Sequence, residues 1–548
     1  MLIDSIYYAY FDTLPPIQAL KQIGQLQAVG QSISNLLDYR ILLLVLDIPL
    51  LIYFLVRTRK KGIFGSKRKG IFDKFFNKKS MRVAFLFFII TLITIGIKYK
   101  FPSLKAQELY TYHIVNIKDS LLNKDGQINN KTDPITEEDI LDLRERARLK
   151  TGKYTGIGKG KNLIVIQVEA LQDFVIGLDY NNQEITPNLN KLVKASSSIY
   201  YDQYFQLLGT GNTADAEFVS HNSLHPALGE PIYSKYTDNT FYGLPWLLRD
   251  NGYTAWALHG YVKDFWNREE AYKGQGFQRF ISEEDFYFPV AIGFGLRDQD
   301  FFQQSTDFLK ELDSIDKHPF YAFLVTLTSH TPFKMPKAYH RLELFDEDKD
   351  NMLGNYLQSI HYTDRHLGKF IEDLKEEGLY DDTVIAIYGD HFAIKSTQEE
   401  ASLMTKLLDR EYDYDEMLHI PLIIHVPGED IGETISTVGS QLDFYPTIMN
   451  IMGYDNTKGL VFGRDLTNYK EYNFVAPQTY LLKGSFIDNN TLFKMSKDKV
   501  FEHSNAINRQ TGESVDIEQY KIISEKAKEE IHKSLYILEN NLLKNYVK

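Results

Sequence analysis

Val384-Ile385-Ala386-Ile387-Tyr388-Gly389-Asp390-His391 is the stretch that decides the fold. It is a short apolar run, rich in β-branched residues, that stops at Gly-Asp-His. Such a run predicts a buried strand, of the kind found in parallel sheets. Ligands of open α/β sheets bind just beyond the carboxyl ends of these strands. Asp390 and His391 offer an oxygen and a nitrogen to a metal ion there, although an isolated Asp-His pair fits a surface turn equally well.

Similar apolar runs alternate with helical patterns between residues 162 and 458. The sequence predicts strands at 163–168, 253–258, 320–327, 384–388 and 422–426, and helices at 186–195 and 355–377. This alternation predicts an α/β domain with a mainly parallel sheet sandwiched by helices. Polar residues repeatedly follow the strands, namely Glu169, His259, His330, Asp390 and His391. Each alone fits a surface group, but their recurrence at strand ends indicates a site.

A candidate nucleophile lies in the glycine-containing segment 209–218, GTGNTADAEF. Its glycines permit a tight approach of the backbone. A helix that begins near Thr213 would point free N–H groups at an anion such as phosphate. Thr213 is then either the N-cap of that helix or a hydroxyl activated by a metal ion.

Composition excludes several classes of chemistry. The 548 residues include no cysteine, which excludes disulfides, thiolate catalysis and cysteine-bound zinc or iron. A sulfatase is also disfavoured, because it needs a Cys or Ser converted to formylglycine and Thr213 cannot be converted in that way. The formal net charge of -12 argues against nucleic acid as the partner.

Two apolar runs, at 41–56 and 83–97, predict transmembrane helices within residues 40–98. The loop between them, 57–82, is strongly basic, so the positive-inside rule places it in the cytoplasm. Residues 1–39 and everything after about residue 99 then lie outside the cell. A pair of buried core helices is the alternative, but it does not explain the basic loop.

The remaining segments flank the α/β domain. Residues 99–161 read as a juxtamembrane connector with a helix at 136–148, where Thr136 precedes acidic residues of the first turn. Residues 459–548 read as a smaller C-terminal α+β subdomain whose last part, 517–548, has a helical pattern. A role of this helix at the membrane surface fits less well, because acidic residues are mixed among its basic ones.

Taken together, the motifs resemble the lipoteichoic acid synthase family, membrane phosphoglycerol transferases of the alkaline phosphatase/sulfatase superfamily. The match runs in the same order over nearly the whole chain. Its segments are VEALQDF with Glu169, TPNLNKL, GTGNTADAEF with Thr213, HGYVKDFWNR with His259, Trp266 and Arg268, LTSHTPF with His330, YGDH with Asp390 and His391, and QLDFYPT with Asp443 and Pro446.

The resemblance implies a role for each matched residue. One manganese ion, or Mg²⁺ in its place, would be held by Glu169, Thr213, Asp390 and His391, with Thr213 as the nucleophile. The glycerol phosphate pocket would be lined by His259, Trp266, Arg268 and His330. One departure is Asn212, where such synthases commonly carry lysine, so a positive charge beside the phosphate is missing. The two apolar runs would be the last two of five membrane helices.

Elementary chemistry agrees with these roles. Carboxylates with one imidazole suit Mn²⁺ or Mg²⁺, and a divalent ion lowers the pKa of a bound hydroxyl such as that of Thr213. Arg268 can fork onto phosphate oxygens, and Trp266 can stack on glycerol carbons or simply pack in the core. We expect His330 to protonate a leaving alkoxide, because histidine titrates near neutral pH. The remaining candidates are expected to be structural, namely His221, His225, His361 and His366.

The sequence therefore predicts a multi-pass protein of the cell membrane, in a Gram-positive bacterium, with an extracellular catalytic domain. Its expected reaction takes glycerol phosphate from phosphatidylglycerol through a covalent threonine intermediate. The acceptor would be a glycolipid or the end of a glycerol phosphate chain. Two alternatives stay open at this point. One is a Mn²⁺-dependent phosphodiesterase that passes the intermediate to water, and the other is a catalytically inactive membrane sensor.

Overall fold

The computed structural model describes residues 134–547 together with Asp4 and His113. The predicted membrane segments at 41–56 and 83–97, the basic loop 57–82 and most of the connector lie outside these residues. Within the described ranges, no helix is both long and apolar enough to cross a bilayer. Everything below concerns the compact unit 131–548.

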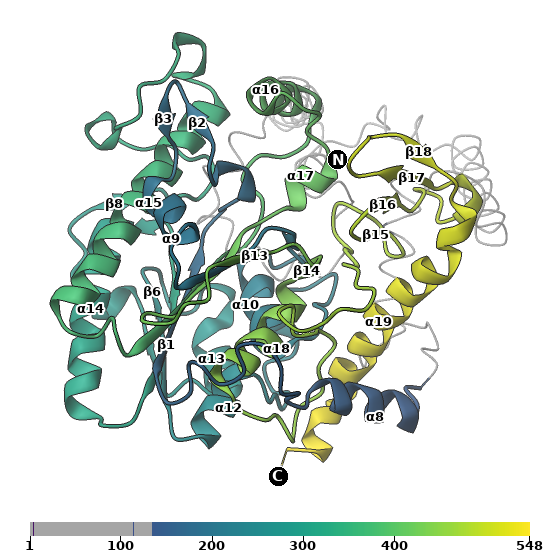
Figure 1. Cartoon of the computed structure of the whole chain (residues 1–548), viewed down its shortest axis with the longest axis horizontal. Coiled ribbons are helices and arrows are strands. Elements are labelled where there is room, and N and C mark those ends of the chain that lie inside the picture. The colour runs from purple at the N-terminus through teal and green to yellow at the C-terminus, as the bar shows by residue number, and fades with distance from the viewer. Residues whose placement is uncertain (1–3, 5–112, 114–133, 548) are drawn as a thin grey trace, which may run out of the picture. The chain divides into compact units, whose positions relative to one another are not determined.

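An eight-stranded sheet forms the centre of this unit, in the order β13-β4-β12-β11-β1-β10-β6-β7 (Figure 1). Its strands are β1 (Asn162–Val168), β4 (Ser198–Tyr201), β6 (Thr254–His259), β7 (Arg279–Ile281), β10 (Phe320–Val325), β11 (Thr383–Gly389), β12 (Leu422–His425) and β13 (Glu433–Ile435). The two central strands, β1 and β11, are buried along their whole length. Burial on both faces is why their sequences are nearly continuous apolar runs.

The sheet is mixed and mainly parallel. β11, β1, β10, β6 and β7 run parallel to one another in that order. β12 is the exception, because it pairs antiparallel with both β11 and β4. The strand predicted at 422–426 is thus present, but it does not belong to the parallel set. The parallel run places the carboxyl ends of β1, β6, β10 and β11 at one edge of the sheet.

Helices cover both faces of the sheet, as the sequence predicts (Figure 1). The helices of the α/β domain are α9 (Pro187–Val193), α10 (Thr213–Asn222), α11 (Ile232–Lys235), α12 (Leu244–Asp250), α13 (Arg268–Gln275), α14 (Asp298–Ile315), α15 (Met352–Glu376), α16 (Gln398–Leu408), α17 (Tyr414–Leu418) and α18 (Gln441–Met452). Short two-stranded ribbons complete the loops, formed by β2 (Asp179–Tyr180) with β3 (Gln183–Glu184), β5 (Tyr204–Phe205) with β14 (Gly439–Ser440), and β8 (Ala291–Ile292) with β9 (Gly295–Leu296).

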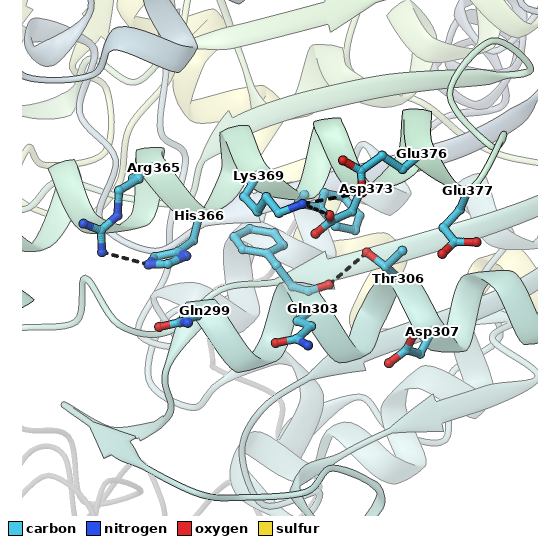
Figure 2. A pocket seen from close by; sticks show the side chains of 12 residues that line it. Gln299, Gln303, Thr306, Asp307, Arg365, His366, Lys369, Asp373, Glu376 and Glu377 are labelled. Carbon is cyan, nitrogen blue, oxygen red and sulfur yellow. Dashed lines mark hydrogen bonds and ion pairs between the residues drawn. The ribbon is translucent and has the colours of Figure 1, made fainter.

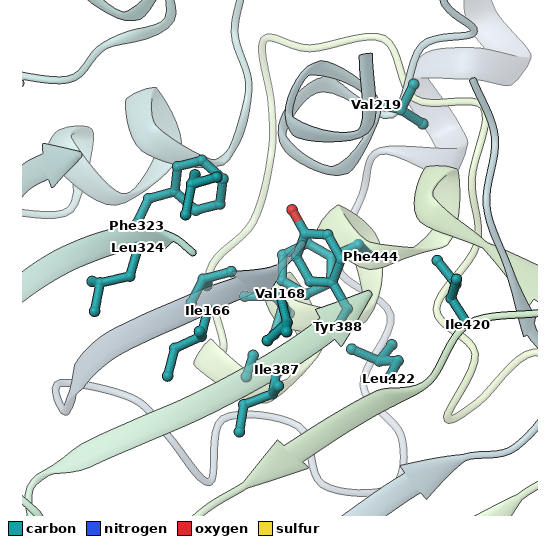
Figure 3. Packing of buried hydrophobic residues seen from close by; sticks show 14 of the residues in the cluster. Ile166, Val168, Val219, Phe323, Leu324, Ile387, Tyr388, Ile420, Leu422 and Phe444 are labelled. Atoms are coloured by element: carbon teal, nitrogen blue, oxygen red, sulfur yellow. The ribbon is translucent and has the colours of Figure 1, made fainter. Parts of the chain in front are cut away.

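The core beneath the site is packed by side chains of β11, α10 and α18. Tyr388 of β11 lies against Phe444 of α18, with ring centroids 4.9 Å apart, and Val219 of α10 belongs to the same cluster (Figure 3). Ile387, the neighbour of Tyr388, is also completely buried. Because successive side chains of a strand point to opposite faces, this double burial fixes the position of the residues that follow β11.

A C-terminal subdomain follows the α/β domain. It contains an antiparallel sheet of β15 (Phe486–Ile487), β16 (Thr491–Lys494), β17 (Asn505–Asn508) and β18 (Ser514–Val515), together with α19 (Lys521–Glu539). Its apolar core is separate from the main one and includes the stacked rings of Phe486 and Phe493. The predicted helical pattern in 517–548 corresponds to α19.

The helix predicted at 136–148 is α8 (Glu137–Arg146), which begins with a capping box between Thr136 and Asp139. It packs on the domain. Lys533 of α19 lies 2.6 Å from Asp139, and Arg148, just after α8, binds Asp455 with contacts of 2.5–3.0 Å. The described part of the connector is therefore held against the domain at both ends of this helix.

Candidate active site

Two strand ends bring three ionisable side chains together. Glu169 follows β1, and Asp390 and His391 follow β11, which is the neighbour of β1 in the sheet. One ligand atom from each lies within 4.8 Å of the others, and all three residues are buried. The His391 Nε2 atom lies 3.5 Å from the Glu169 Oε1 atom and 3.5 Å from the Asp390 Oδ2 atom. The predicted carboxylate and imidazole ligands therefore do converge.

The oxygen atoms of this cluster that lack hydrogen-bond donors within the described part of the chain fit a divalent cation. Glu169 Oε1 and Asp390 Oδ2 are buried and accept no hydrogen bond from any described residue. Burial, and then the neighbouring Asp390 carboxylate, raise the pKa of Glu169 well above its ordinary value. The His391 Nδ1 atom lies 2.8 Å from the Phe392 carbonyl, which keeps its proton there and turns the Nε2 lone pair toward the carboxylates. Two unsatisfied oxygens and one imidazole lone pair form a hard donor set.

Asp390 is held in place by its other oxygen. Its Oδ1 atom accepts hydrogen bonds from the backbone N–H groups of Ala170 and His391, each 2.7 Å long. The Ala170 bond ties the residue after Glu169 to the end of β11. Because the backbone fixes Oδ1, Oδ2 is left facing the cluster.

Thr213 is the first residue of α10, and its hydroxyl joins the cluster. The Thr213 Oγ1 atom lies 3.4 Å from Glu169 Oε2, and the residue is 9% exposed. The N-cap position belongs to Asn212, whose φ of 40° and ψ of -110° lie outside the left-handed helical region that asparagine commonly adopts. The hydroxyl of Thr213 donates to Glu169 and lies inside the first turn of α10, one position after the N-cap. Of the two roles that the sequence allows for Thr213, the capping role is thus not the one observed.

The loop before Thr213 is shaped by Asp215, which sequence reasoning did not single out. The Asp215 Oδ2 atom accepts hydrogen bonds from the N–H groups of Gly209 (3.0 Å) and Gly211 (2.7 Å). A Cβ atom on Gly211 would lie 2.6 Å from Asp215 Oδ1, so a larger residue there would displace the Asp215 carboxylate. Burial raises the pKa of Asp215 to about 7, against the effect of these backbone donors. An acidic residue two positions after a candidate nucleophile is the signal that was available.

The residues predicted to bind substrate lie at the end of β6 and in the segments that follow β6 and β10. His259 is the last residue of β6, and its Nδ1 atom lies 3.1 Å from the Val325 carbonyl of β10. Burial lowers the pKa of His259 well below its ordinary value, and the positive charge of Arg268 lowers it further. Arg268 begins α13 and is 1% exposed. Its guanidinium binds Glu217, a residue of α10 that the sequence did not point to.

Trp266 and His330 are connected by a series of aromatic rings. Trp266 has a φ of 58° and lies 5.1 Å, centroid to centroid, from Phe265. Phe265 is 5.3 Å from Phe294, and Phe294 stacks on His330 at 4.5 Å with an interplanar angle of 16°. Burial lowers the pKa of His330 to about 4, so its imidazole is neutral at pH 7. This burial contradicts the expectation from the sequence that His330 titrates near neutral pH.

Three of the four histidines expected to be structural are held by hydrogen bonds in the fold. His221 bonds the Glu217 carbonyl and the Tyr321 hydroxyl, and His361 bonds the Ile185 carbonyl. His225 is fully buried near Phe462. His366 lies in a groove of about 540 Å³ between α14 and α15, where its Nε2 atom accepts a hydrogen bond of 3.0 Å from Arg365 (Figure 2). That groove is lined by side chains of the two helices and includes no residue of the cluster.

Comparisons with known proteins agree with this geometry. A sulfatase family model matches residues 161–454, and a model of the lipoteichoic acid synthase N-terminal domain matches residues 1–116. Lipoteichoic acid synthase 1 of Bacillus subtilis is 30% identical over 90% of this chain and 79% of its own. The lipoteichoic acid synthase-like protein YvgJ of the same organism is 29% identical over 99% of this chain and 86% of its own.

A solved structure extends the likeness to the fold. The crystal structure of the lipoteichoic acid synthase LtaP from Listeria monocytogenes is 30% identical, with a TM-score of 0.67, and covers 75% of this chain and 99% of its own. Together with the two family models, these relatives show that the chain belongs to the lipoteichoic acid synthase family, within the sulfatase and alkaline phosphatase superfamily.

Proposed function

We propose that this protein transfers glycerol phosphate from phosphatidylglycerol to a glycolipid or to the end of a growing glycerol phosphate chain. The observation that carries the proposal is the position of the Thr213 hydroxyl, 3.4 Å from Glu169, beside buried carboxylate oxygens that lack donors among the described residues. Membership of the lipoteichoic acid synthase family supplies the donor and acceptor classes. The N-terminal family match supports a membrane protein, and we place its catalytic domain outside the cell.

Four side chains would hold a divalent cation, Mn²⁺ or Mg²⁺, namely Glu169, Thr213, Asp390 and His391. When bound, such an ion lowers the pKa of a hydroxyl beside it and offsets negative charge on phosphate oxygens. The donor set of two carboxylates, one imidazole and one hydroxyl favours these metals over softer ones. Neutralisation of the buried carboxylates would also remove the repulsion that raises the pKa of Glu169.

In the first step, the Thr213 oxygen attacks the phosphorus of the donor. The bond from phosphorus to the diacylglycerol oxygen breaks, and that oxygen leaves with a proton. In the second step, an acceptor hydroxyl attacks the glycerophospho-threonine, and Thr213 recovers its hydroxyl. The proton that Thr213 gives up in the first step is thus matched by the one that the acceptor gives up in the second.

The other predicted residues would bind and orient the donor. Arg268 would bind phosphate oxygens, with His259 beside it, and Trp266 would contact the glycerol carbons. His330 is neutral in the ligand-free protein. The negative charge of a bound phosphodiester raises the pKa of a nearby imidazole, and His330 would then carry the proton to the leaving oxygen.

The test is an assay of the full chain with fluorescent phosphatidylglycerol, a glycolipid acceptor and Mn²⁺. We expect fluorescent diacylglycerol and an acceptor that carries glycerol phosphate. If free glycerol phosphate is the only product besides diacylglycerol, the protein is a hydrolase and not a transferase. A protein that binds Mn²⁺ and releases no diacylglycerol would overturn both enzymatic functions.

A further inference from the structure

A buried ion pair joins α10 to α13, and its arginine is one of the residues predicted to bind the donor. The Arg268 side chain is 1% exposed and the Glu217 side chain 0%. The Glu217 Oε1 atom accepts hydrogen bonds from Arg268 Nε (3.0 Å) and Arg268 Nη2 (2.7 Å). Glu217 Oε2 accepts a third, 2.8 Å long, from the hydroxyl of Tyr272. The carboxylate is therefore fixed from two sides.

The pair leaves one donor of the guanidinium unused. Arg268 Nη1 is buried and has no hydrogen-bond partner among the described residues, although Nε and Nη2 are both bound. A charged, buried donor without an acceptor is costly to a folded protein. An ion pair that served the core alone would be expected to satisfy all of its donors. The unused Nη1 instead marks the side of Arg268 on which an anion is expected.

Glu217 also shares a helix with the nucleophile. Thr213 and Glu217 are four residues apart on α10, so they lie on the same face of the helix, one turn from each other. A single rigid element therefore carries the attacking hydroxyl and the anchor of the arginine. Tyr272 comes from α13, the helix that Arg268 begins, and closes the arrangement from the other side.

We propose that Glu217 and Tyr272 are positioning residues, which hold Arg268 so that its Nη1 group meets the phosphate of the donor at a fixed distance from Thr213. This inference rests on the proposed function. It adds that the spacing between nucleophile and phosphate-binding arginine is set by one turn of α10, through a carboxylate that itself touches no substrate. Two donors of one guanidinium that bind the same carboxylate fix the orientation of the guanidinium as well as its position.

The first test removes one oxygen atom. Tyr272→Phe loses only the hydrogen bond to Glu217, and we expect the KM for phosphatidylglycerol to rise roughly three- to tenfold, because a bond to a charged group is lost. The control is Tyr180→Phe, since the buried Tyr180 hydroxyl donates a bond of 2.7 Å to Asp348 and accepts one of 3.1 Å from the Phe345 N–H in another part of the domain. The control is expected to lose at least as much stability as Tyr272→Phe and to keep the wild-type KM. Equal KM values in the two variants would overturn the proposal.

The second test separates position from charge. In Glu217→Gln, the amide oxygen can still accept both hydrogen bonds from Arg268, so we expect a KM within about threefold of wild type. Glu217→Leu removes the acceptor, and a misplaced guanidinium is expected to lower kcat/KM on the order of 100-fold. If kcat/KM falls as much in Glu217→Gln as in Glu217→Leu, Glu217 contributes its charge and does not position Arg268, and the proposal fails.

A binding measurement distinguishes failure of this inference from failure of the proposed function. Thermal unfolding of the full chain is followed with Mn²⁺ alone and with Mn²⁺ plus glycerol phosphate. We expect every folded variant to keep the shift caused by Mn²⁺, while Tyr272→Phe and Glu217→Leu lose most of the additional shift caused by glycerol phosphate. A wild-type protein that neither responds to glycerol phosphate nor turns over the lipid would refute the proposed function itself. If glycerol phosphate shifts the unfolding temperature of the wild type and of the variants equally, only the positioning role is refuted.

Discussion

Two partly or fully buried groups of charges differ in how their polar atoms are used. At the carboxyl ends of β1 and β11, Glu169 and Asp390 each leave one oxygen without a donor among the described residues. Beside the C-terminal subdomain, Glu530 of α19 accepts hydrogen bonds from Arg146 (3.2 Å) and Arg464 (3.4 Å). Those arginines also donate to other acceptors, the Phe462 carbonyl and the Asn473 side chain.

The difference separates two uses of buried charge. A group whose donors and acceptors match holds elements of the fold together, here α8, α19 and the loop after α18. A group with unmatched acceptors costs folding free energy and persists where it binds something. The contrast predicts that substitutions at the strand ends change activity and metal response, whereas substitutions at Glu530 change stability.

The largest effect is expected for Thr213→Ala. Loss of the Thr213 hydroxyl should lower turnover by on the order of 1,000-fold or more, because the proposed covalent intermediate forms on this hydroxyl. The melting temperature should stay close to that of the wild type, since the N-cap of α10 is Asn212 and the Thr213 hydroxyl makes only a long bond of 3.4 Å to Glu169 among the described residues. Release of fluorescent diacylglycerol and thermal unfolding are the two measurements. Thr210→Ala, in the same loop, is the control and should retain activity; near-wild-type turnover in Thr213→Ala would exclude it as nucleophile.

Glu169→Gln is expected to change both metal response and pH dependence. The pKa of Glu169 is raised in the folded protein, so its contribution to stability is fully present below the unfolded value of about 4.5 and is lost as pH rises through the folded pKa. Without metal, the wild type should therefore lose stability toward pH 8 relative to the variant, by roughly 1.4 kcal/mol per unit of pKa shift. Unfolding curves from pH 5 to 8, with EDTA or Mn²⁺, test this.

In the same curves, Mn²⁺ should stabilise the wild type increasingly as pH rises, because the metal competes with the proton on Glu169. The glutamine variant should show little stabilisation by Mn²⁺ at any of these pH values. Parallel curves for the two proteins in EDTA would contradict the raised pKa. An undiminished response of the variant to Mn²⁺ would remove Glu169 from the metal site.

The smallest effect on turnover is expected for Glu530→Gln. The variant should lose about 1–2 kcal/mol of unfolding free energy, because two partly exposed arginines lose their shared carboxylate. Its kcat/KM should stay within about twofold of wild type. Denaturant unfolding and the lipid assay measure the two quantities. A variant of unchanged stability and reduced turnover would show that this group of charges acts on the site after all.

The sequence predicted the features that depend on short segments. The continuous apolar runs before Glu169 and Asp390 identified β1 and β11, and their alternation with helices identified the parallel layout. The direction of β12 was not accessible in this way, because an apolar run does not encode whether its neighbour is parallel.

Features that depend on distant partners were missed for the same reason. Glu217 and Arg268 are 51 positions apart, and their pairing follows only from the packing of α10 against α13. The lowered pKa of His330 depends on burial, including the ring of Phe294 stacked on its imidazole. A motif that contains Arg268 does not reveal that Glu217 is its partner. A motif that contains His330 does not reveal that other side chains bury its imidazole.

The length of α18 has a consequence for how the domain can be tethered. Its first residue, Gln441, donates a hydrogen bond of 2.7 Å to the Asp390 carbonyl, while residues near its last turn accept bonds from Gly156 and Gly158. Twelve helical residues span about 18 Å. Segment 148–158 thus joins the domain at the edge remote from Thr213. The described part of the connector therefore reaches the domain away from the strand ends that carry Glu169, Asp390 and His391.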